Sequence, residues 1–325
     1  MNYRTLKQAV RVIESEGQLD FRLFDARHSM PSSPMSASRA SSIREGRIPD
    51  EDSEFVTWLA ERGLLEATRE PSPLAARFIE RHDRTLRYLA SFEHDDLTAL
   101  DMLLNLYQSR VLVIGIGGVG SWITYSLMMS GIGTVIAVDG DAVDCSNLNR
   151  TALYGPADIG VSKVIAASRE LTALFPDQTF IGHEEWIDSA QSVARFASDV
   201  DFVISAADTP HRWIRMWVRE GARISGVPVV ETMGGAIGPI RGHGATPYDR
   251  GVAVDSSGAV RVPSQNLNGV ARGPGVPPFH PMVDAAGICQ AVFETLSRSR
   301  ESPLAHGYVK KGSLVSLGSF HAMDA

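Results

Sequence analysis

The sequence predicts an α/β protein whose main part is a doubly wound, mostly parallel sheet, with a small α+β domain added at the N-terminus. Short apolar runs recur at residues 111–114, 134–138 and 202–207, with helical segments between them. Strands of a parallel sheet are buried on both faces, so they read as near-continuous apolar runs of this kind. Further strands are expected at 178–183, 227–232 and, as a final pair, 308–320; helices are expected at 74–92, 95–107, 162–175, 190–196, 210–225 and 284–298.

Residues 1–78 are expected to form the small N-terminal domain, and residues 79–325 the main domain. Helical apolar spacing predicts a helix over 5–16, followed by a strand at 19–24 and a second helix over 50–65. The segment FVTWLAERGLL resembles the last helix and wing of a winged-helix-like module. Such modules bind DNA or, in peptide-modifying enzymes, a leader peptide by strand addition. A dimerisation or packing extension is the remaining alternative.

The composition limits the class of protein. The 325-residue chain has 44% hydrophobic and 21% charged residues, which is typical of a globular protein. Its net charge of −7 argues against a nucleic-acid partner held by backbone electrostatics. The two cysteines, Cys145 and Cys289, exclude a disulfide framework and a four-cysteine zinc site, and they suit a cytoplasmic location.

Residues 111–138 carry no charged side chain and are long enough to span a bilayer. Their glycines gather at two turn positions, and the apolar runs between them have the length of a strand or a helix. We therefore expect buried strands around a buried helix, and no membrane partner. The first 20 residues mix charges throughout and contain no apolar signal core.

A glycine motif follows the first of these strands. Gly115, Gly117 and Gly120 satisfy the dinucleotide pattern G-x-G-x-x-G, with Gly118 inside it. Such glycines let the backbone turn sharply and approach phosphate, and the N-terminus of the next helix offers N–H groups to an anion. Asp139, 19 residues after Gly120, is placed to bond ribose hydroxyls. These features indicate a Rossmann-like nucleotide site, for which NAD would be the default ligand.

The residues after Asp139 indicate a different ligand. Asp141 is followed by the run SNLNR at 146–150 and by GVSK at 160–163. With Ser121 completing the glycine motif, these segments resemble the ThiF/MoeB/HesA superfamily of ubiquitin-activating-type adenylyltransferases, whose pattern reads GxGGxGS, DxDxVxxSNLxRQ and GxxK. Thr151 stands where the usual Gln would be. Segments 81–85, 205–210 and 286–291 also match, so the resemblance covers roughly residues 79–300.

The resemblance implies ATP-dependent adenylation, in which a carboxylate attacks the α-phosphorus of ATP. Arg150 and Lys163 are expected to hold the phosphates with Asn147 beside them, because fixed cations stabilise the charge that builds on phosphate oxygens. Asp208 is expected to hold Mg²⁺. Arg84 is expected to reach the triphosphate of the neighbouring subunit, which implies a homodimer. The expected nucleotide contacts are Gly115, Gly117, Gly118, Gly120, Asp139 and Asp141.

Each of these residues also has an ordinary structural explanation. Arg150 and Lys163 taken singly would be solvated surface charges, and Asp208 would be a helix N-cap. Arg84 is one of four arginines between residues 77 and 87, which makes its assignment the least specific.

The chain departs from many family members in two respects. It has no pair of C-x-x-C motifs, so no zinc is expected. Neither Cys145 nor Cys289 lies where a nucleophile is needed, so we expect the substrate's own nucleophile to attack the acyl-adenylate. A small module before the activating domain resembles the peptide-modifying branch, to which MccB and PaaA belong. That layout implies a ribosomally made peptide, matured in antibiotic biosynthesis, whose leader binds the N-terminal domain. The loop at 248–281 is either a cover over this peptide or a disordered crossover.

Other substrates stay open. The activated group could be the C-terminus of a sulfur-carrier protein or a tRNA-bound carboxylate, although the pI of about 5.7 weighs against tRNA. A scaffold that binds nucleotide without turnover is the alternative outside the enzymes. A NAD-dependent oxidoreductase is the remote fourth.

Overall fold

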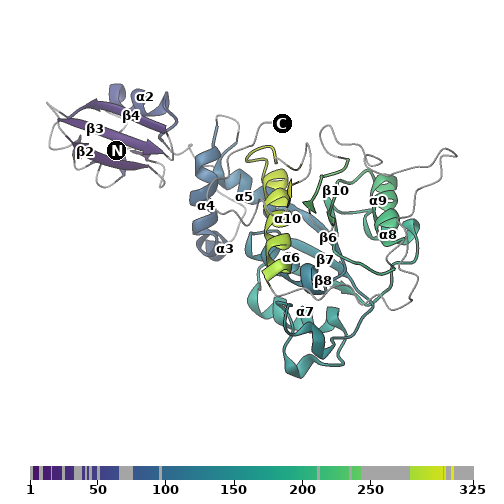
Figure 1. The fold of residues 1–325 in the computed structure, drawn as a ribbon. Helices are drawn as coiled ribbons and strands as arrows, with labels where there is room; N and C mark the ends of the chain where they lie inside the picture. Colours follow the sequence, from purple (N-terminus) through teal and green to yellow (C-terminus); the bar gives the residue numbers. More distant parts are fainter. Residues whose placement is uncertain are drawn as a thin grey trace. The chain divides into compact units, whose positions relative to one another are not determined.

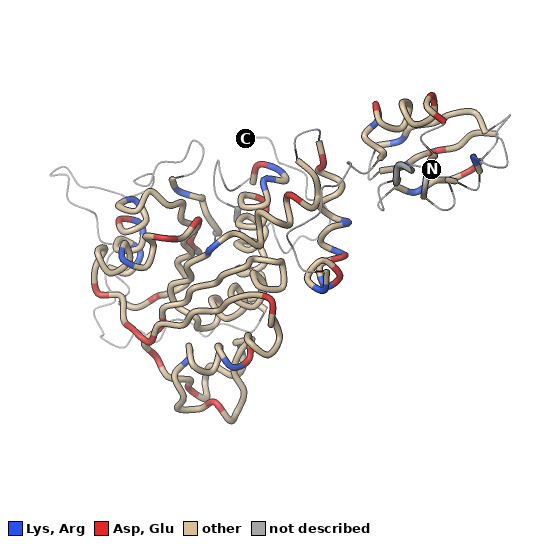
Figure 2. Tube along the Cα trace, turned by 180° about the vertical axis from the view of Figure 1, so that it is seen from behind, with Lys and Arg blue, Asp and Glu red and all other residues tan. Residues whose placement is uncertain are grey.

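A computed structural model describes most of the chain. The described residues are 3–6, 10–15, 17–23, 26–32, 39, 40, 42, 43, 46–49, 52–65, 76–94, 97–210, 213–233, 236–242, 279–302, 304, 309 and 310. The chain divides into two compact units, Met1–Asn105 and Leu106–Ala325. Basic and acidic positions are mixed within both units (Figure 2). Among the described residues, no helix has both the length and the apolar character that crossing a bilayer requires.

The first unit is built on a small antiparallel sheet packed against a helix (Figure 1). The sheet has the order β2-β3-β4, and a separate ladder pairs β1 with β5. The elements are β1 (Tyr3–Thr5), β2 (Arg11–Ser15), β3 (Gln18–Leu23), β4 (Ala26–Pro31), β5 (Arg47–Pro49) and α2 (Ser53–Ala60). Phe21 of β3 contacts Phe55 and Trp58 of α2, with ring centroids 6.0 and 5.4 Å apart. The predicted small α+β unit is confirmed.

The helix predicted over 5–16 is wrong. Among the described residues of that range, Thr5 ends strand β1 and Arg11–Ser15 form strand β2, which pairs with β3 from Arg11↔Arg22 to Ser15↔Gln18. Gly17 adopts φ +80°, which lets the chain reverse between the two strands. The pairing places Val12 beside the buried Phe21, so burial of the alternate residues of a strand outweighs the helical spacing of Leu6, Val10 and Ile13.

The helix predicted over 74–92 is interrupted. It consists of α3 (Ala76–Arg81), α4 (Asp83–Leu89) and a 3₁₀ turn, η1 (Ala90–Phe92). The break comes at His82, whose buried ring stacks on Phe78 at 4.2 Å and whose Nδ1 is 2.9 Å from the Phe78 carbonyl oxygen. The next predicted helix is present as α5 (Ala99–Gln108).

The second unit contains the predicted sheet. Its strand order is β12-β11-β10-β9-β6-β7-β8, in which β10, β9, β6, β7 and β8 are parallel and the other two antiparallel. The strands are β6 (Arg110–Ile114), β7 (Thr134–Val138), β8 (Thr179–His183), β9 (Phe202–Ser205), β10 (Val229–Met233), β11 (Ala236–Ile237) and β12 (Val309–Lys310). The five parallel strands are those the apolar runs predicted. Of the final strand pair predicted at 308–320, the described residues include only Val309 and Lys310, which form β12.

Helices cover both faces of this sheet, so the doubly wound arrangement is confirmed (Figure 1). Helices α6, α7 and α10 lie on one face, and α8 and α9 on the other. On the second face, Leu112 and Ile136 of the sheet pack with Val193 of α8 and Val218 of α9. The helices are α6 (Gly118–Met129), α7 (Lys163–Leu174), α8 (Ala190–Phe196), α9 (Ile214–Ser225) and α10 (Phe279–Ser297). Most of the predicted loop at 248–281, residues 248–278, lies outside the described residues, and residues 279–281 belong to α10.

Candidate active site

The sheet topology fixes where a ligand can bind. The chain runs from β6 outward to β7 and β8, then returns to the other side of β6 to form β9 and β10. In such sheets the ligand crevice lies outside the carboxyl ends of the strands where the order reverses, here between β6 and β9. The glycine motif follows β6, and Ala206, Ala207 and Asp208 follow β9. The predicted nucleotide motif and the predicted Mg²⁺ ligand therefore meet at the same edge.

Two of the motif glycines are required by close packing. A Cβ on Gly120 would lie 1.9 Å from the carbonyl oxygen of Gly115, and one on Gly115 would lie 2.8 Å from Cα of Ala207. Gly115 also has φ +86°, which residues with side chains rarely adopt. Gly117 is different, because a Cβ there would meet nothing within 4 Å. Gly117 caps α6, so the partial positive charge of a helix N-terminus lies at this turn.

Asp139 ties the two strand ends together. It follows β7, and its carboxylate accepts hydrogen bonds from the backbone N–H of Ile116 (2.8 Å) and of Asp141 (2.9 Å). The residue is 9% exposed, so the carboxylate is nearly buried. One oxygen thus holds the glycine turn and the other holds the loop that begins the second motif. Asp139 thus lies at the predicted nucleotide site, and each of its oxygens keeps a further lone pair for another donor.

Lys163 is held at the same point by the geometry of its own loop. Gly160 adopts φ +85° and donates its N–H to the Val143 carbonyl oxygen at 2.9 Å, which turns the chain back so that α7 starts at Lys163. The lysine is 6% exposed, and its Nζ lies 2.6 Å from Asp141 Oδ2 and 3.5 Å from Asp139 Oδ1. The G-x-x-K spacing therefore delivers a buried ammonium to the carboxylates of the D-x-D motif.

Arg150 lies against the N-terminus of α6. A Cβ on Gly118 would lie 3.4 Å from Cδ of Arg150, so the arginine stem covers this glycine. Trp122 of α6 donates its indole N–H to the Arg150 carbonyl oxygen at 3.1 Å and fixes the end of the loop. The guanidinium donates to the Ser146 carbonyl oxygen and to Asn149 Oδ1, and within the described part of the chain it pairs with no carboxylate.

Asn147 has a local structural role in this structure. Its Oδ1 accepts from the backbone N–H of Asp144 at 3.1 Å, while Asp144 Oδ1 accepts from the N–H of Ser146 at 2.7 Å. This reciprocal capping box closes the 3₁₀ turn η2 (Cys145–Asn147) that carries the motif loop. A contact between Asn147 and a phosphate remains a prediction.

Two predicted residues, Asp208 and Arg84, make no hydrogen bond or ion pair with this cluster among the described residues. Asp208 is exposed after β9, where its Oδ1 accepts from the hydroxyl of Thr209 at 3.2 Å. Arg84 is exposed on α4 of the first unit and makes no ion pair with any described residue. In the described ranges no three His, Cys, Asp or Glu side chains gather to hold a metal ion. A single exposed carboxylate nevertheless suits Mg²⁺, which keeps several waters and takes its other oxygens from substrate phosphates.

Sequence reasoning missed two aromatic residues that hold the site, Tyr154 and Trp186, and the contact that the motif residue Ser121 makes. The Tyr154 hydroxyl donates to the Ile116 carbonyl oxygen at 2.7 Å, and Ser121 Oγ accepts from the N–H of Ala152 at 3.1 Å. Burial, followed by the charges of Asp139 and two other aspartates, raises the pKa of Tyr154, so the phenol stays protonated and donates. Trp186 lies on Gly140, where an added Cβ would be 2.5 Å from the indole Nε1.

The two cysteines differ in environment. Cys289 is buried on α10, and burial raises the pKa of its thiol to about 12. Such a thiol is not a nucleophile at neutral pH. Cys145 is exposed in the motif loop.

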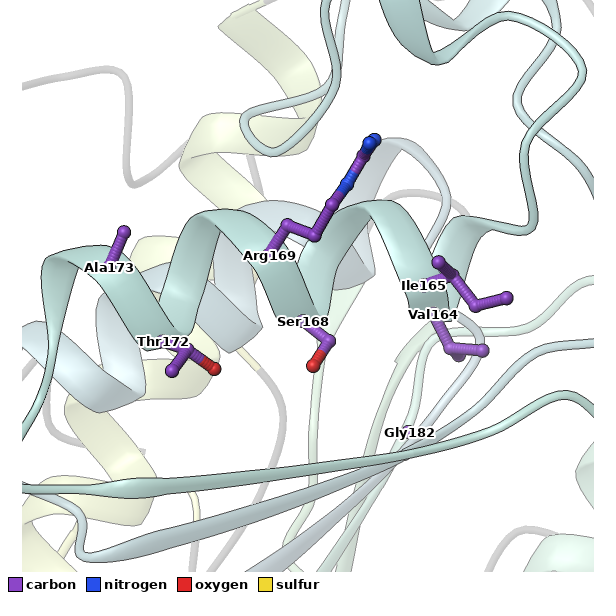
Figure 3. Close-up of a pocket in the computed structure, with 7 residues that line it drawn as sticks. All are labelled: Val164, Ile165, Ser168, Arg169, Thr172, Ala173 and Gly182. Atoms are coloured by element: carbon purple, nitrogen blue, oxygen red, sulfur yellow. The ribbon is translucent and has the colours of Figure 1, made fainter.

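A groove of about 640 Å³ lies between α7 and β8 (Figure 3). Val164, Ser168 and Thr172 point from the helix toward the strand that carries Gly182, and Arg169 points away. None of the predicted site residues lines this groove, so it is separate from the nucleotide site.

The comparison with known proteins decides the family. Residues 82–266, more than half of the chain, match the ThiF family. The chain belongs to the ThiF family. This confirms the resemblance found in the glycine, D-x-D and G-x-x-K motifs.

Curated relatives match this ThiF-family chain over part of their length. The adenylyltransferase and sulfurtransferase uba4 of Aspergillus niger is 34% identical over 127 residues, which cover 39% of this chain and 26% of the relative. The SAMP-activating enzyme E1 of Haloferax volcanii is 32% identical over 142 residues, covering 43% and 50%. The matched region thus spans between about a quarter and half of these relatives.

Solved structures match almost the whole chain. PaaA is 24% identical with a TM-score of 0.73, covering 92% of this chain and 93% of PaaA. Escherichia coli MccB, solved with ATP, is 17% identical with a TM-score of 0.65, covering 93% and 91%. These likenesses show that the fold is shared.

Proposed function

We propose that this chain is an ATP- and Mg²⁺-dependent adenylyltransferase that activates a carboxylate of a ribosomally made peptide. The observation that carries the proposal is that Lys163 and Arg150 are both connected to the glycine turn at the reversal point of the sheet. Lys163 reaches the turn through Asp139, which holds Ile116, and Arg150 lies on Gly118. Two fixed cations and a helix N-terminus therefore converge where a triphosphate can bind.

The reaction needs this arrangement. A substrate carboxylate oxygen bonds to the α-phosphorus, the bond from that phosphorus to the bridging oxygen breaks, and pyrophosphate leaves. Two anions must approach each other in this step, and charge grows on the phosphate oxygens, so Lys163 and Arg150 lower its barrier. Asp208 would hold Mg²⁺, which would supply further charge neutralisation. A substrate amide or amine then attacks the acyl carbon, AMP leaves and the nucleophile loses a proton.

Two features support a peptide substrate without a thioester step. The thiol of Cys289 is buried with its pKa raised to about 12, and the exposed Cys145 belongs to the motif loop. The first unit carries a three-stranded sheet whose order leaves β2 and β4 with unpaired edges in the described part of the chain. An open edge can accept a leader peptide as an added strand. Escherichia coli MccB has been solved with its peptide MccA, which makes this class of substrate the first to test.

The test is ATP–pyrophosphate exchange with short peptides encoded next to the gene. We expect exchange that depends on peptide and Mg²⁺, and loss of at least about a hundredfold in Lys163→Ala, because a phosphate contact made in the transition state is removed. Arg195→Gln, an exposed arginine on α8, is the matched control. Unchanged turnover in Lys163→Ala or Asp208→Ala would show that the mechanism is wrong.

The proposal includes a homodimer in which Arg84 of one subunit reaches the ATP of the other. Arg84→Ala and Lys163→Ala should then each be inactive, yet activity should return when they are mixed. Random exchange makes half of the dimers mixed, and one of their two sites is intact, so about a quarter of the wild-type activity is expected. Absence of recovery in a mixture shown to contain mixed dimers would place Arg84 outside the partner's site.

A second candidate substrate is the C-terminus of a sulfur-carrier protein. It is favoured by the names of the curated relatives, an adenylyltransferase and sulfurtransferase and a SAMP-activating enzyme. Exchange stimulated by a sulfur-carrier protein and by none of the peptides would support it.

A further inference from the structure

A buried cluster of ion pairs joins β10 to α9. Glu231 of β10 is 2% exposed, and its Oε1 accepts hydrogen bonds from Arg219 of α9, from Nε at 2.8 Å and from Nη2. Arg241, which is 1% exposed, reaches the same oxygen with its Nε at 3.4 Å. These residues belong to none of the sequence motifs. They are connected to the Asp208 segment, which we define as residues 206–210.

Strand pairing fixes the first end of the Asp208 segment. Ser205 is the last residue of β9, and the parallel register places it opposite Glu231 of β10. The N–H of the next residue, Ala206, donates to the carbonyl oxygen of Ile114 at 2.9 Å. Glu231 therefore lies on the strand beside the point where the segment begins.

Helix α9 fixes the other end of this segment. The carbonyl oxygen of Pro210 accepts the N–H groups of Trp213 and Ile214 at 2.9 and 3.0 Å, so the end of the segment is bonded to the start of the helix. Arg219, in the second turn of α9, then links the helix back to Glu231. The two ends of the segment are thus joined to each other through this one carboxylate.

The carboxylate of Asp208 depends on these ends for its position. It is exposed, and among the described residues its side chain accepts only from the hydroxyl of Thr209 at 3.2 Å. A buried ion pair contributes little to stability compared with apolar side chains of similar size. Its charge-assisted hydrogen bonds are directional, however, so they hold two elements in one relative arrangement. The ion pair between Arg219 and Glu231 is suited to this second task.

We propose that Arg219 and Glu231 are positioning residues whose ion pair sets the place of the Asp208 carboxylate, and thereby the affinity for the Mg²⁺ that Asp208 would hold. The proposal rests on the function proposed above and adds two residues to it. Neither residue touches the nucleotide or the substrate, because both act through the backbone of the Asp208 segment. Loss of the pair should loosen the segment and weaken metal binding although the metal ligand is still present.

The test variant is Arg219→Met, which cuts the link to α9 and leaves Glu231 paired with Arg241. The matched control is Arg300→Met. Arg300 pairs with Glu294, a carboxylate of α10 that is 1% exposed, in the same way: its Nε is 2.8 Å from Oε1, and its Nη2 donates to the same oxygen. Both substitutions remove a guanidinium from a buried carboxylate, but only the first breaks the link between the two ends of the Asp208 segment.

Hydrogen exchange in peptide 206–214, followed by mass spectrometry without any ligand, is the first measurement. We expect Arg219→Met to accelerate exchange of the Trp213 and Ile214 amides about tenfold or more, because a hydrogen bond to a charged group that holds their helix is lost. Arg300→Met should leave this exchange within about twofold of the wild type. Equal exchange in the two variants would overturn the proposal.

The second measurement is the binding of Mn²⁺, used as a paramagnetic substitute for Mg²⁺, in the presence of a non-hydrolysable ATP analogue. Electron paramagnetic resonance gives the Kd for the ion. We expect this Kd to rise about threefold to tenfold in Arg219→Met and to stay within about twofold in Arg300→Met. Asp208→Asn, which removes the ligand itself, sets the largest loss. Faster hydrogen exchange with an unchanged Kd would overturn the proposal, because the ion pair would then only stabilise the segment.

Pyrophosphate exchange separates this proposal from the enzymatic one. A wild type that binds Mn²⁺ and the analogue but lacks pyrophosphate exchange would refute only the enzymatic function. Lys163→Ala should lose pyrophosphate exchange and keep the hydrogen exchange of peptide 206–214, since Lys163 pairs with Asp139 and Asp141. A wild type that binds no Mn²⁺ would refute the Mg²⁺ site and this proposal together.

Discussion

Replacing two glycines of the same motif by alanine should have different effects: Gly120→Ala should lower stability, and Gly117→Ala should lower ATP affinity. At Gly120 the new methyl group would lie 1.9 Å from the Gly115 carbonyl oxygen and 3.3 Å from Cβ of Ala206. Gly115 cannot move away freely, because its own Cα already faces Ala207 in the next loop. At Gly117 the new methyl group would meet nothing within 4 Å, and φ is −73°.

The overlap at Gly120 sets the magnitude. A Cβ and a carbonyl oxygen need roughly 3.2 Å, so the backbone must open by more than about 1 Å at the centre of the motif. Overpacking of this kind costs about 3 kcal/mol, at the upper end of its usual range. For a unit of this size, each kcal/mol lowers Tm by about 2–4 °C, which gives a decrease of about 6–12 °C. Gly117→Ala loses about 1 kcal/mol or less at a helix N-cap, which corresponds to no more than about 4 °C.

Thermal unfolding by circular dichroism and ATP binding by calorimetry together test this reasoning. Gly120→Ala should be strongly destabilised, and Gly117→Ala should stay folded but lose ATP affinity, because its methyl group fills the space that a phosphate would use. If Gly120→Ala is no less stable than Gly117→Ala, the packing argument is refuted. If folded Gly117→Ala binds ATP as the wild type does, the phosphates do not approach this turn.

Three other outcomes are expected. Lys163→Met should lose about 2 kcal/mol of stability in urea titration, because Asp139 and Asp141 lose a charged hydrogen-bond donor. Unchanged stability would show that the contacts of Lys163 with the two aspartates do not stabilise the fold. Iodoacetamide at pH 8 should modify the exposed Cys145 and spare Cys289, whose pKa of about 12 leaves roughly one thiolate in ten thousand; equal labelling in peptide mapping would contradict this. The hydrogen bond from Ser29, followed by Arg27, lowers the pKa of Asp20 in the folded state. Its contribution to stability is therefore fully present above the unfolded pKa of about 4 and is lost as the pH falls from there through the lower folded pKa. Acid titration followed by Trp58 fluorescence should therefore show a flatter curve in Asp20→Asn, and identical curves would count against the Asp20 network.

Much of the fold followed from the sequence because burial on both faces leaves a plain pattern. The parallel strands β6, β7 and β9 are buried along their length and read as apolar runs. The helix predicted over 5–16 failed for the opposite reason. Strand β2 is largely exposed, and only its pairing with β3 reveals that Val12 faces the core. A pairing between segments is not visible in the periodicity of either one.

The residues of the candidate site also fall into two groups, those that the sequence predicted and those that only the structure revealed. Motif spacing predicted Gly115, Asp139 and Lys163 because the glycine turn, the strand end and the helix start are local in sequence. The groups that support them are distant: Tyr154 bonds Ile116 across 38 residues, and Trp186 lies on Gly140. Neither aromatic belongs to a motif, and an aromatic residue in a loop has many ordinary explanations. The supporting residues were therefore found only in the structure, whereas the motif residues were predicted from the sequence.

The arrangement around Lys163 suggests an order to the events on the proposed function. Its ammonium is shared by Asp139, which is nearly buried, and Asp141, whose side chain is 48% exposed. Breaking the pair with the exposed Asp141 costs less free energy than breaking the pair with Asp139, because water solvates the released Asp141 carboxylate. Asp139 is also held by two backbone N–H groups, so it cannot move without opening the glycine turn. An incoming triphosphate would therefore displace Asp141 and leave Asp139 in place, and the two aspartates of the D-x-D motif have different functions. On the proposed function, the first would maintain the turn and the second would hold the lysine until a phosphate replaces it.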